Sequence, residues 1–466
     1  MSQYTPVNDE ELAQTVEVEP RHSDASPLLG QGSSSSQKAF PFAEDAPTAT
    51  VLSSCINLAN TILGAGMFAM PSAIASVGLL FGSGLIGLSG FASGLGLYLL
   101  ARCASHVEGR NASFNTISLL SYPNAAIWFD LAIAIKCFGV SISYLIVIGD
   151  LMPEVMGWFG ISPSHSFLLD RRFWITIFML FIIPLAFLRK LDSLRYTSFV
   201  ALSAVLYLIV IVIYHYLDPE QPSPPPEDIH LINFGGMFLS RFPIFVFAFT
   251  CHQNIFTVYN ELRDNSDRQV NSVIFYSIGA SFLVYQVVGV LGYLTFGDHV
   301  LGNIIKMYDN GVVLTIGRFA LVILVMFSYP LQAHPCRASI DKVMNVLFNT
   351  NLEVPQFEEE EEDGKSDTLA RKHVYEISNY RFFTITPLII VSTYLIAISV
   401  SQLDLVLAFV GSTGSTAISF ILPGLFYSKI HQNDPWNITR VAAAVLFVYG
   451  IGVMTICLSY NIYHLF

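Results

Sequence analysis

Residues 60–71 read "NTILGAGMFAMP", and this short stretch decides how the chain folds. It lies inside a long apolar run, yet Gly64 and Gly66 give the backbone extra freedom and Pro71 lacks an N–H. In lipid, an interrupted backbone is tolerated where it is buried in protein or lines a cavity. Small residues also let two helices approach each other closely. The stretch therefore predicts either a membrane helix broken around a site or a close helix contact.

The composition identifies lipid as the solvent of the chain. Of its 466 residues, 53% are hydrophobic and 12% are charged, and this charged share is about half that of a soluble domain. Residues 46–101 contain no charged side chain over 56 positions, whereas one helix needs roughly 20 residues to cross the hydrocarbon. We expect an integral membrane protein that contacts membrane lipid along most of its length.

Eleven uncharged or nearly uncharged stretches follow one another along the chain. They are rich in Leu, Ile, Val, Phe and Ala and lack the alternation of a membrane β-strand. The predicted fold class is an all-α integral membrane protein with about 11 transmembrane helices. The predicted spans are residues 51–79, 82–103, 125–149, 173–189, 196–217, 237–259, 271–297, 312–335, 382–401, 404–428 and 439–463.

Lysine and arginine accumulate on one side of these spans. With the N-terminus in the cytosol, 17 of the 23 lysines and arginines lie on the cytosolic side, where such residues are retained. An odd number of crossings then places the C-terminus on the opposite face.

Polar segments accompany the predicted membrane domain, which covers residues 49–466. Residues 1–48 are predicted to be a disordered cytosolic tail, and residues 341–381 an acidic cytosolic linker, because few apolar residues accompany their charges. Within the tail, Asp24, Leu28 and Leu29 match an acidic dileucine sorting signal that a trafficking adaptor would bind. A chance match in an unstructured tail is the alternative.

The residues that carry most enzyme chemistry are not arranged for it in this sequence. The six cysteines lie in predicted spans or at their cytosolic ends, which gives no disulfide framework. The eleven histidines show no metal-ligand spacing, and no phosphate loop, nucleophile elbow or basic patch for nucleic acid is present. The sequence predicts no enzyme activity, no metal, no cofactor and no nucleic-acid partner.

A second interruption occurs in the sixth predicted span. It reads "RFPIFVFAFTCHQNIFTVYNEL" over residues 241–262, where Pro243 is followed by the polar run 250–254 at mid-membrane depth. Two broken spans five helices apart are typical of a transporter built from two inverted repeats. We therefore predict a LeuT-like 5+5 inverted repeat with broken helices 1 and 6. Repeat one would cover residues 49–217, repeat two residues 237–428, and an eleventh helix residues 439–463.

Such a pair of breaks favours a zwitterionic substrate. The N-termini of the half-helices attract a carboxylate, and the freed carbonyls attract an ammonium group or a cation.

Six motifs give the chain a resemblance to a known family. It resembles the amino acid/auxin permease family, and within it the fungal vacuolar amino-acid transporters, over about residues 50–460. The resemblance implies eleven crossings, a cytosolic N-terminus, a lumenal C-terminus, and proton-driven movement of amino acids across the vacuolar membrane, with export to the cytosol favoured. The motifs are "NLANTILGAGMFAMPSA" (57–73), "FDLAIAIKCFGVSISYLIVIGDLMP" (129–153), "KLDSLRYTS" (190–198), "PIFVFAFTCHQNIF" (243–256), "GYLTFGDHVLGNII" (292–305) and "YPLQAHPCRASI" (329–340).

The resemblance also implies a substrate region in the two broken spans. Sodium-coupled animal relatives use an Asn in span one and a hydroxyl in span eight, and Asn60 and Ser328 fill those places. These two residues leave Na⁺ open, but the acidic lumen of a vacuole supplies a proton gradient, so H⁺ is the expected coupling ion. The implied substrate residues are Thr61, Gly64, Ala65, Gly66, Met67, Phe249, Thr250, Cys251, His252 and Asn254.

Three further side chains are candidates for coupling or gating. Lys136 lies inside the third span, where an ionisable group is costly, so it would neutralise a carboxylate, replace a cation or titrate. The alternative is a structural bond to Asp130 or to a backbone carbonyl. His252 would carry a proton or be a satisfied interior histidine. Tyr144, like Phe249, would gate the site or simply pack.

A different class, a receptor that senses an amino acid without moving it, has to be weighed against a transporter. Sensors of this fold add a signalling domain, whereas the tails here are short and the linker is too charged to fold alone. Secondary active transport is the predicted function.

Overall fold

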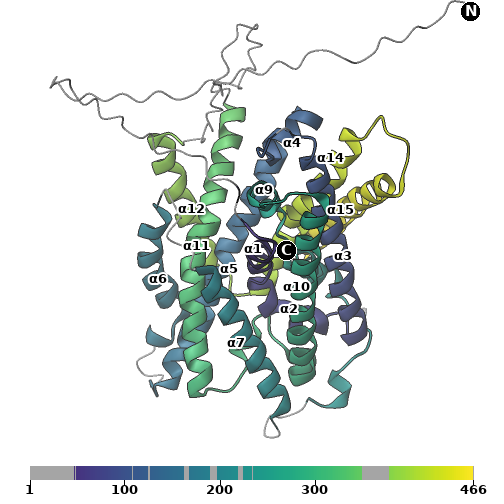
Figure 1. The fold of residues 1–466 in the computed structure, drawn as a ribbon. Helices are drawn as coiled ribbons and strands as arrows, with labels where there is room; N and C mark the ends of the chain where they lie inside the picture. Colours follow the sequence, from purple (N-terminus) through teal and green to yellow (C-terminus); the bar gives the residue numbers. More distant parts are fainter. Residues whose placement is uncertain are drawn as a thin grey trace, which may run out of the picture. The chain divides into compact units, whose positions relative to one another are not determined.

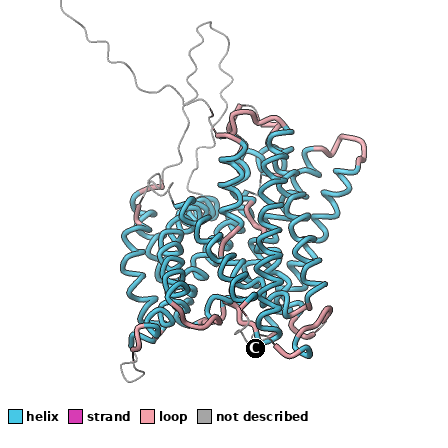
Figure 2. Tube along the Cα trace, turned by 60° about the horizontal axis from the view of Figure 1, so that its bottom comes forward, coloured by secondary structure: helices cyan, strands magenta, loops and turns pink. Residues whose placement is uncertain are grey.

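The computed structural model describes residues 47, 49–107, 109–123, 126–161, 167–188, 197–218, 224–233, 235–348 and 377–464, with no side-chain detail for 197–201. The predicted sorting signal at Asp24, Leu28 and Leu29 and most of the predicted acidic linker lie outside these residues. Within them the regular structure is helical, apart from one isolated β-bridge between Ala49 and Leu262. Figure 2 shows helix throughout, with most loops at the two ends of the bundle.

Helices occupy each of the eleven predicted ranges (Figure 1). Among the described helices, seven are long and apolar enough to cross a membrane, or eight if α1 and α2 form one bent span. This confirms a helical multi-pass fold, while the count of eleven spans stays a prediction. The helices are α1 (Val51–Ile62), α2 (Ala65–Ala75), α3 (Leu79–Ala104), α4 (Phe114–Ser121), α5 (Ala126–Trp158), α6 (Arg171–Ala186), α7 (Thr197–Leu217), α8 (Phe238–Ala248), α9 (Ile255–Glu261), α10 (Asp267–Phe296), α11 (Val312–Leu347), α12 (Asn379–Ser399), α13 (Leu403–Val410), α14 (Leu422–Ile430) and α15 (Ile438–Tyr463).

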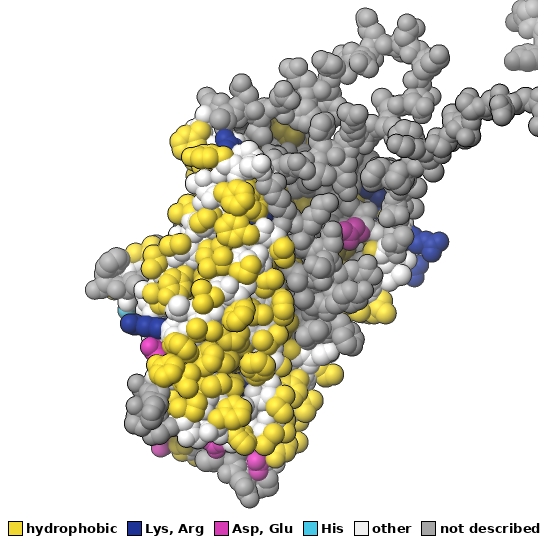
Figure 3. Space-filling model, turned by 90° about the vertical axis from the view of Figure 1, so that its left-hand side faces the viewer, with side chains coloured by type: hydrophobic (Ala, Val, Ile, Leu, Met, Phe, Trp, Pro, Cys, Tyr) yellow, Lys and Arg dark blue, Asp and Glu magenta, His cyan; other side chains and the backbone are white. Residues whose placement is uncertain are grey.

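The outer surface of the bundle is apolar. Phe181 on α6, Leu388 on α12 and Val445 on α15 are 58%, 60% and 62% exposed. In Figure 3, apolar side chains cover most of the described surface on the side viewed. Large exposed apolar side chains at this density are stable against lipid and not against water.

Helices α5 and α11 run against each other through the bundle and extend beyond their predicted ends. The sequence predicted ends at 149 and 335, because charged residues follow. The acids there are instead buried and bonded within the bundle: Asp150 accepts a hydrogen bond from the Asn303 amide at 3.4 Å, and Asp341 pairs with Arg381 at 3.4 Å. A paired acid does not have to leave the helix for water.

Both predicted interruptions are present. The chain bends by 55° between α1 and α2, at Leu63 and Gly64. Between α8 and α9 it leaves the helix at Phe249 and forms one turn of 3₁₀ helix, His252–Asn254. In both places the irregular backbone lies inside the bundle, which is where lipid permits it.

The tenth predicted span contains two π-helical segments, η8 (Gly411–Ser415) and η9 (Ala417–Ile421), between α13 and α14. Its glycines are needed for close approach: a Cβ on Gly411 would lie 2.1 Å from the Pro243 oxygen, and one on Gly414 would lie 2.6 Å from the Ala132 oxygen. Span ten therefore contacts α8 and α5 backbone to backbone.

The outer ends of the broken spans are also held. On the predicted cytosolic side, Ala49 N–H donates to Glu261 O at 3.1 Å, which joins the start of α1 to the end of α9. On the other side, Arg241 of α8 pairs with Asp404 of α13 at 2.7 Å and donates to Ser72 of α2. Each end thus links span one to span six.

Candidate functional site

The two breaks face each other and are joined by side chains. Asn254 Nδ2 donates to Thr61 Oγ1 at 2.7 Å, and Thr61 Oγ1 in turn donates to Asn57 O at 3.0 Å. A Cβ on Gly66 would lie 3.0 Å from Ala248 Cα, so this glycine lets the second half of span one lie against the first half of span six. The predicted helix contact and the predicted break occur at the same place.

A small cavity of about 20 Å³ lies between the breaks and helices α5 and α11. A water molecule needs roughly 10–15 Å³, so the cavity holds about one water and is too small for an amino acid. The structure is therefore a closed state of the site. The lining residues are Thr61, Ile62, Gly64, Ala65, Lys136, Val140, Tyr144, Phe247, Thr250 and Gln332.

Lys136 is the only charged residue in this lining. It is 3% exposed, and within the described residues its ammonium has no hydrogen-bond or ion-pair partner. The alternative bond to Asp130 is not made, because Asp130 pairs with Lys342 at 3.8 Å. A buried cation without a protein anion is costly, and inside a membrane protein it marks a binding or conduction site.

Six predicted residues line the cavity, and eight lie outside its lining. Those in the wall are Thr61, Gly64, Ala65, Thr250, Lys136 and Tyr144. Those outside are Asn60, Gly66, Met67, Phe249, Cys251, His252, Asn254 and Ser328.

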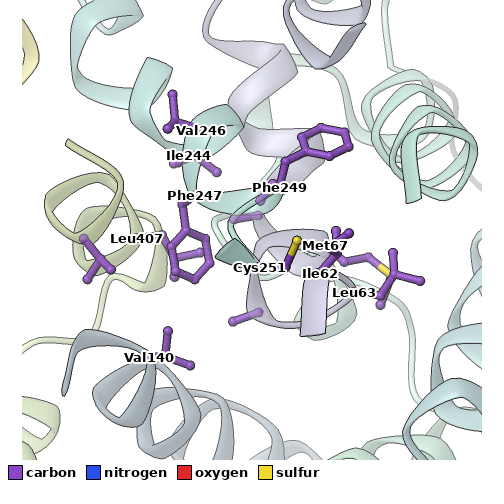
Figure 4. Close-up of a cluster of buried hydrophobic side chains, with 14 of the residues drawn as sticks. Ile62, Leu63, Met67, Val140, Ile244, Val246, Phe247, Phe249, Cys251 and Leu407 are labelled. Atoms are coloured by element: carbon purple, nitrogen blue, oxygen red, sulfur yellow. The ribbon is translucent and has the colours of Figure 1, made fainter. Parts of the chain in front are cut away.

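Phe249 and Phe247 point in opposite directions (Figure 4). Phe247 projects toward Val140 and Leu407 and reaches the cavity wall, whereas Phe249 is fully buried on the far side with its ring 5.1 Å from that of Tyr285. Of the two, Phe247 is therefore the aromatic that closes over the cavity.

His252 is held between two neighbouring helices. Its Nε2 lies 3.0 Å from the Ser93 carbonyl oxygen, which only accepts, so Nε2 carries a hydrogen. Its Nδ1 lies 3.0 Å from Ser419 Oγ, which is also 3.3 Å from Thr250 Oγ1 in the cavity wall. Both ring nitrogens are thus used in anchoring the second break to α3 and span ten.

The pair predicted for sodium coupling is placed outside the cavity. Ser328 Oγ donates to Leu324 O at 2.9 Å within its own helix, and Asn60 is half-buried one residue before Thr61. Neither side chain reaches the cavity wall.

Gln332 and Phe247 belong to the cavity but were not singled out in the sequence. Gln332 Oε1 is buried and has no hydrogen-bond partner among the described residues, so an acceptor in the wall is unfilled. The available signal was a polar residue within the eighth span, two residues before His334 and about one turn before Cys336 in the motif 329–340.

Two interrupted helices around a closed polar cavity with an unpaired cation define a membrane transporter of the broken-helix class. The fold is similar to that of a solved structure titled "Inward facing conformation of Mhp1", with a TM-score of 0.56 and 12% identity over 90% of this chain and 91% of that chain.

The chain belongs to the family described as "Transmembrane amino acid transporter protein", whose model matches residues 47–464. It is 43% identical to vacuolar amino acid transporter 5 of Schizosaccharomyces pombe, over 88% of this chain and 94% of that protein. It is 39% identical to vacuolar amino acid transporter 6 of Saccharomyces cerevisiae, over 88% of this chain and 98% of that protein. The zebrafish sodium-coupled neutral amino acid symporter 2 is 25% identical over 86% of this chain and 80% of that protein. The predicted resemblance is confirmed, and the family and these relatives are transporters and not enzymes.

Proposed function

We propose that the protein is a proton-coupled secondary active transporter that moves amino acids from the vacuole lumen to the cytosol. The observation that carries this proposal is the unpaired Lys136 in the wall of a cavity between two broken helices, in a chain whose relatives are named vacuolar amino acid transporters. The proposed topology has eleven spans in two inverted repeats plus one helix, a cytosolic N-terminus and a lumenal C-terminus. Residues Asp24, Leu28 and Leu29 are proposed to direct sorting through an adaptor.

The cavity wall offers complementary groups for a zwitterion. Helix α2 begins at Ala65 beside the cavity, and its first amides and dipole favour a carboxylate. The Lys136 amine, when protonated, adds a positive charge to the same cavity wall. Thr61 and Thr250 supply hydroxyls, and the unfilled Gln332 Oε1 supplies an acceptor for the substrate's ammonium.

Transport requires this cavity to grow, because it now holds about one water. The irregular backbone at Leu63–Gly64 and Phe249–Cys251 supplies hinges on either side of it. Rotation of one half of each broken span about these hinges would open the cavity to one face at a time.

A proton is the proposed coupling ion. Lys136 already provides a positive charge at the site, so no metal cation is needed there to offset a substrate carboxylate. Asn60 and Ser328, the pair taken over from sodium-coupled relatives, lie outside the cavity wall, and this further favours the proton.

Reconstituted vesicles test the proposal. Acid-inside vesicles without sodium are expected to drive uphill efflux of labelled amino acid, and competition by each proteinogenic amino acid then defines the substrate range. A strict requirement for sodium in this assay would show that the coupling ion is sodium and not the proton. Amino-acid binding without flux under the same gradient would make the protein a sensor.

A further inference from the structure

Tyr285 on α10 connects the two breaks. Its side chain is fully buried, and its hydroxyl oxygen lies 2.6 Å from Ile62 O and 2.8 Å from Ala248 O. Ile62 is the last residue of α1, and Ala248 is the last residue of α8. One side chain therefore reaches the carboxyl ends of both helices that precede a break.

The two carbonyls need a positive partner. Carbonyls at the end of a helix lack the usual intrahelical donors and carry the negative end of the helix dipole. Ile62 O accepts one hydrogen bond from Gly64 N–H at 2.9 Å and has a second lone pair for the phenol, whereas Ala248 O depends on the phenol alone among the described residues. Inside a membrane protein they must be met by a donor or a cation. Two of them converge within 2.8 Å of one point, where they share a hydrogen-bond donor. The same two oxygens would supply part of the oxygen shell of a small cation, with water completing it. A phenol has a single proton, so Ile62 and Ala248 share it.

Packing alone does not require the hydroxyl. The ring of Tyr285 meets that of Phe249 edge to face at 5.1 Å, a contact that a phenylalanine would keep. Phe249 O, the carbonyl of the first residue after α8, likewise accepts a hydrogen bond from a hydroxyl, that of Ser93, at 2.7 Å. Hydroxyl groups on α10 and α3 thus donate hydrogen bonds to backbone carbonyls at the two breaks.

We propose that Tyr285 is the positioning residue that couples the two breaks, and that its hydroxyl stands where a small cation would otherwise bind between Ile62 O and Ala248 O. The expected effect of Tyr285 on flux rests on the proposed transport function. The cation consequence stands without it: removing the phenol leaves Ala248 O without a donor and frees one lone pair of Ile62 O, and these two oxygens then contribute ligands to an alkali cation.

The kinetic test uses Tyr285→Phe in reconstituted vesicles. Loss of the shared hydrogen bond is expected to lower the maximal flux about tenfold, with the substrate KM changed less than the rate. Tyr293→Phe is the matched control, because Tyr293 is a fully buried tyrosine of the same helix whose hydroxyl donates to Asp298 Oδ1 at 3.0 Å, away from the breaks. Wild-type flux in Tyr285→Phe, or failure of that variant to fold, would overturn the positioning role. If the wild-type protein itself shows no flux, the transport proposal fails.

The cation test uses thermal unfolding of the purified full chain in lipid nanodiscs. Tyr285→Ala is expected to gain a saturable stabilisation by sodium or lithium over choline at equal ionic strength, whereas wild type and Tyr293→Phe show none. A folded Tyr285→Ala that does not respond to any alkali cation contradicts the cation-replacement claim. If Tyr285→Ala does not fold, Tyr285→Ser is measured in its place, and its response decides the claim.

Discussion

Asn254 donates a hydrogen bond to Thr61 across 2.7 Å and thereby joins the two interrupted spans, which lie 193 residues apart in the chain at this point. Thr61 lines the cavity and Asn254 does not, so the bond transmits movement of the second break to the wall of the site. In this closed state the bond is intact, and movement of one half-span relative to the other would stretch or break it.

A double-mutant cycle on this pair is the first prediction. Thr61→Val and Asn254→Ala are each expected to lower thermal stability, and the double variant less than the sum, with a coupling energy of about 1 kcal/mol. The cycle is measured by unfolding in nanodiscs with and without substrate. Strict additivity would show that the bond contributes nothing to the closed state.

Lys136 is predicted to lower the thermal stability of the protein while being required for coupled transport. Lys136→Met removes an unpartnered buried charge and keeps the side-chain length, so the melting temperature is expected to rise by roughly 2–5 °C while coupled flux is lost. Lys342→Met is the matched control, because it removes the partner of Asp130 and is expected to lower stability. A Lys136→Met protein with wild-type transport would remove Lys136 from the mechanism.

Gly96 is predicted to be essential although it lies outside the cavity wall. A Cβ there would lie 2.1 Å from Ser419 O and 2.8 Å from His252 Nε2, so Gly96→Ala must displace the anchor of the second break. Overpacking of this kind costs about 1–3 kcal/mol, more than the 0.5–1 kcal/mol that alanine adds to a helix.

The control for this change is on the same helix. The Cβ added by Gly94→Ala would contact only the Ile278 side chain, at 3.9 Å. This variant is expected to be neutral or slightly stabilising. Both variants are compared by thermal unfolding and flux, and equal behaviour of the two would refute the close contact at Gly96.

His252 is predicted to anchor the second break without carrying the coupled proton. Both of its ring nitrogens are engaged, one with Ser93 O and the other with Ser419 Oγ. His252→Gln is therefore expected to lower the flux while the shape of the flux-against-pH curve is retained. Disappearance of the acid-dependent limb in this variant would instead identify His252 as the proton carrier.

The positions of the breaks could be predicted because glycine, proline and polar residues stand out in an apolar background. Gly64, Pro243 and His252 each differ from the Leu, Ile, Val and Phe around them. The structure breaks span one at Gly64 and span six at Phe249–Asn254, which includes His252, whereas Pro243 lies inside α8. Long uncharged runs likewise predicted where helices occur.

Six residues of the cavity wall were predicted, but others could not be predicted in the same way. A helix buried on several sides, such as α5 or α11, has no polar face that tells which residues point inward. Gln332, Phe247 and Tyr285 therefore carried no signal apart from their chemical type. Their roles depend on how α11, α8 and α10, respectively, are rotated. The π-helices of span ten depend in the same way on packing against α5 and α8, which a local pattern does not encode.

The structure of the protein in lipid nanodiscs with a saturating transported amino acid tests the central claim most directly. We predict density for the zwitterion between the start of α2 and the Lys136 ammonium, in a cavity enlarged from its present volume of about 20 Å³. Bound amino acid at another position, with this cavity still closed, would contradict the account.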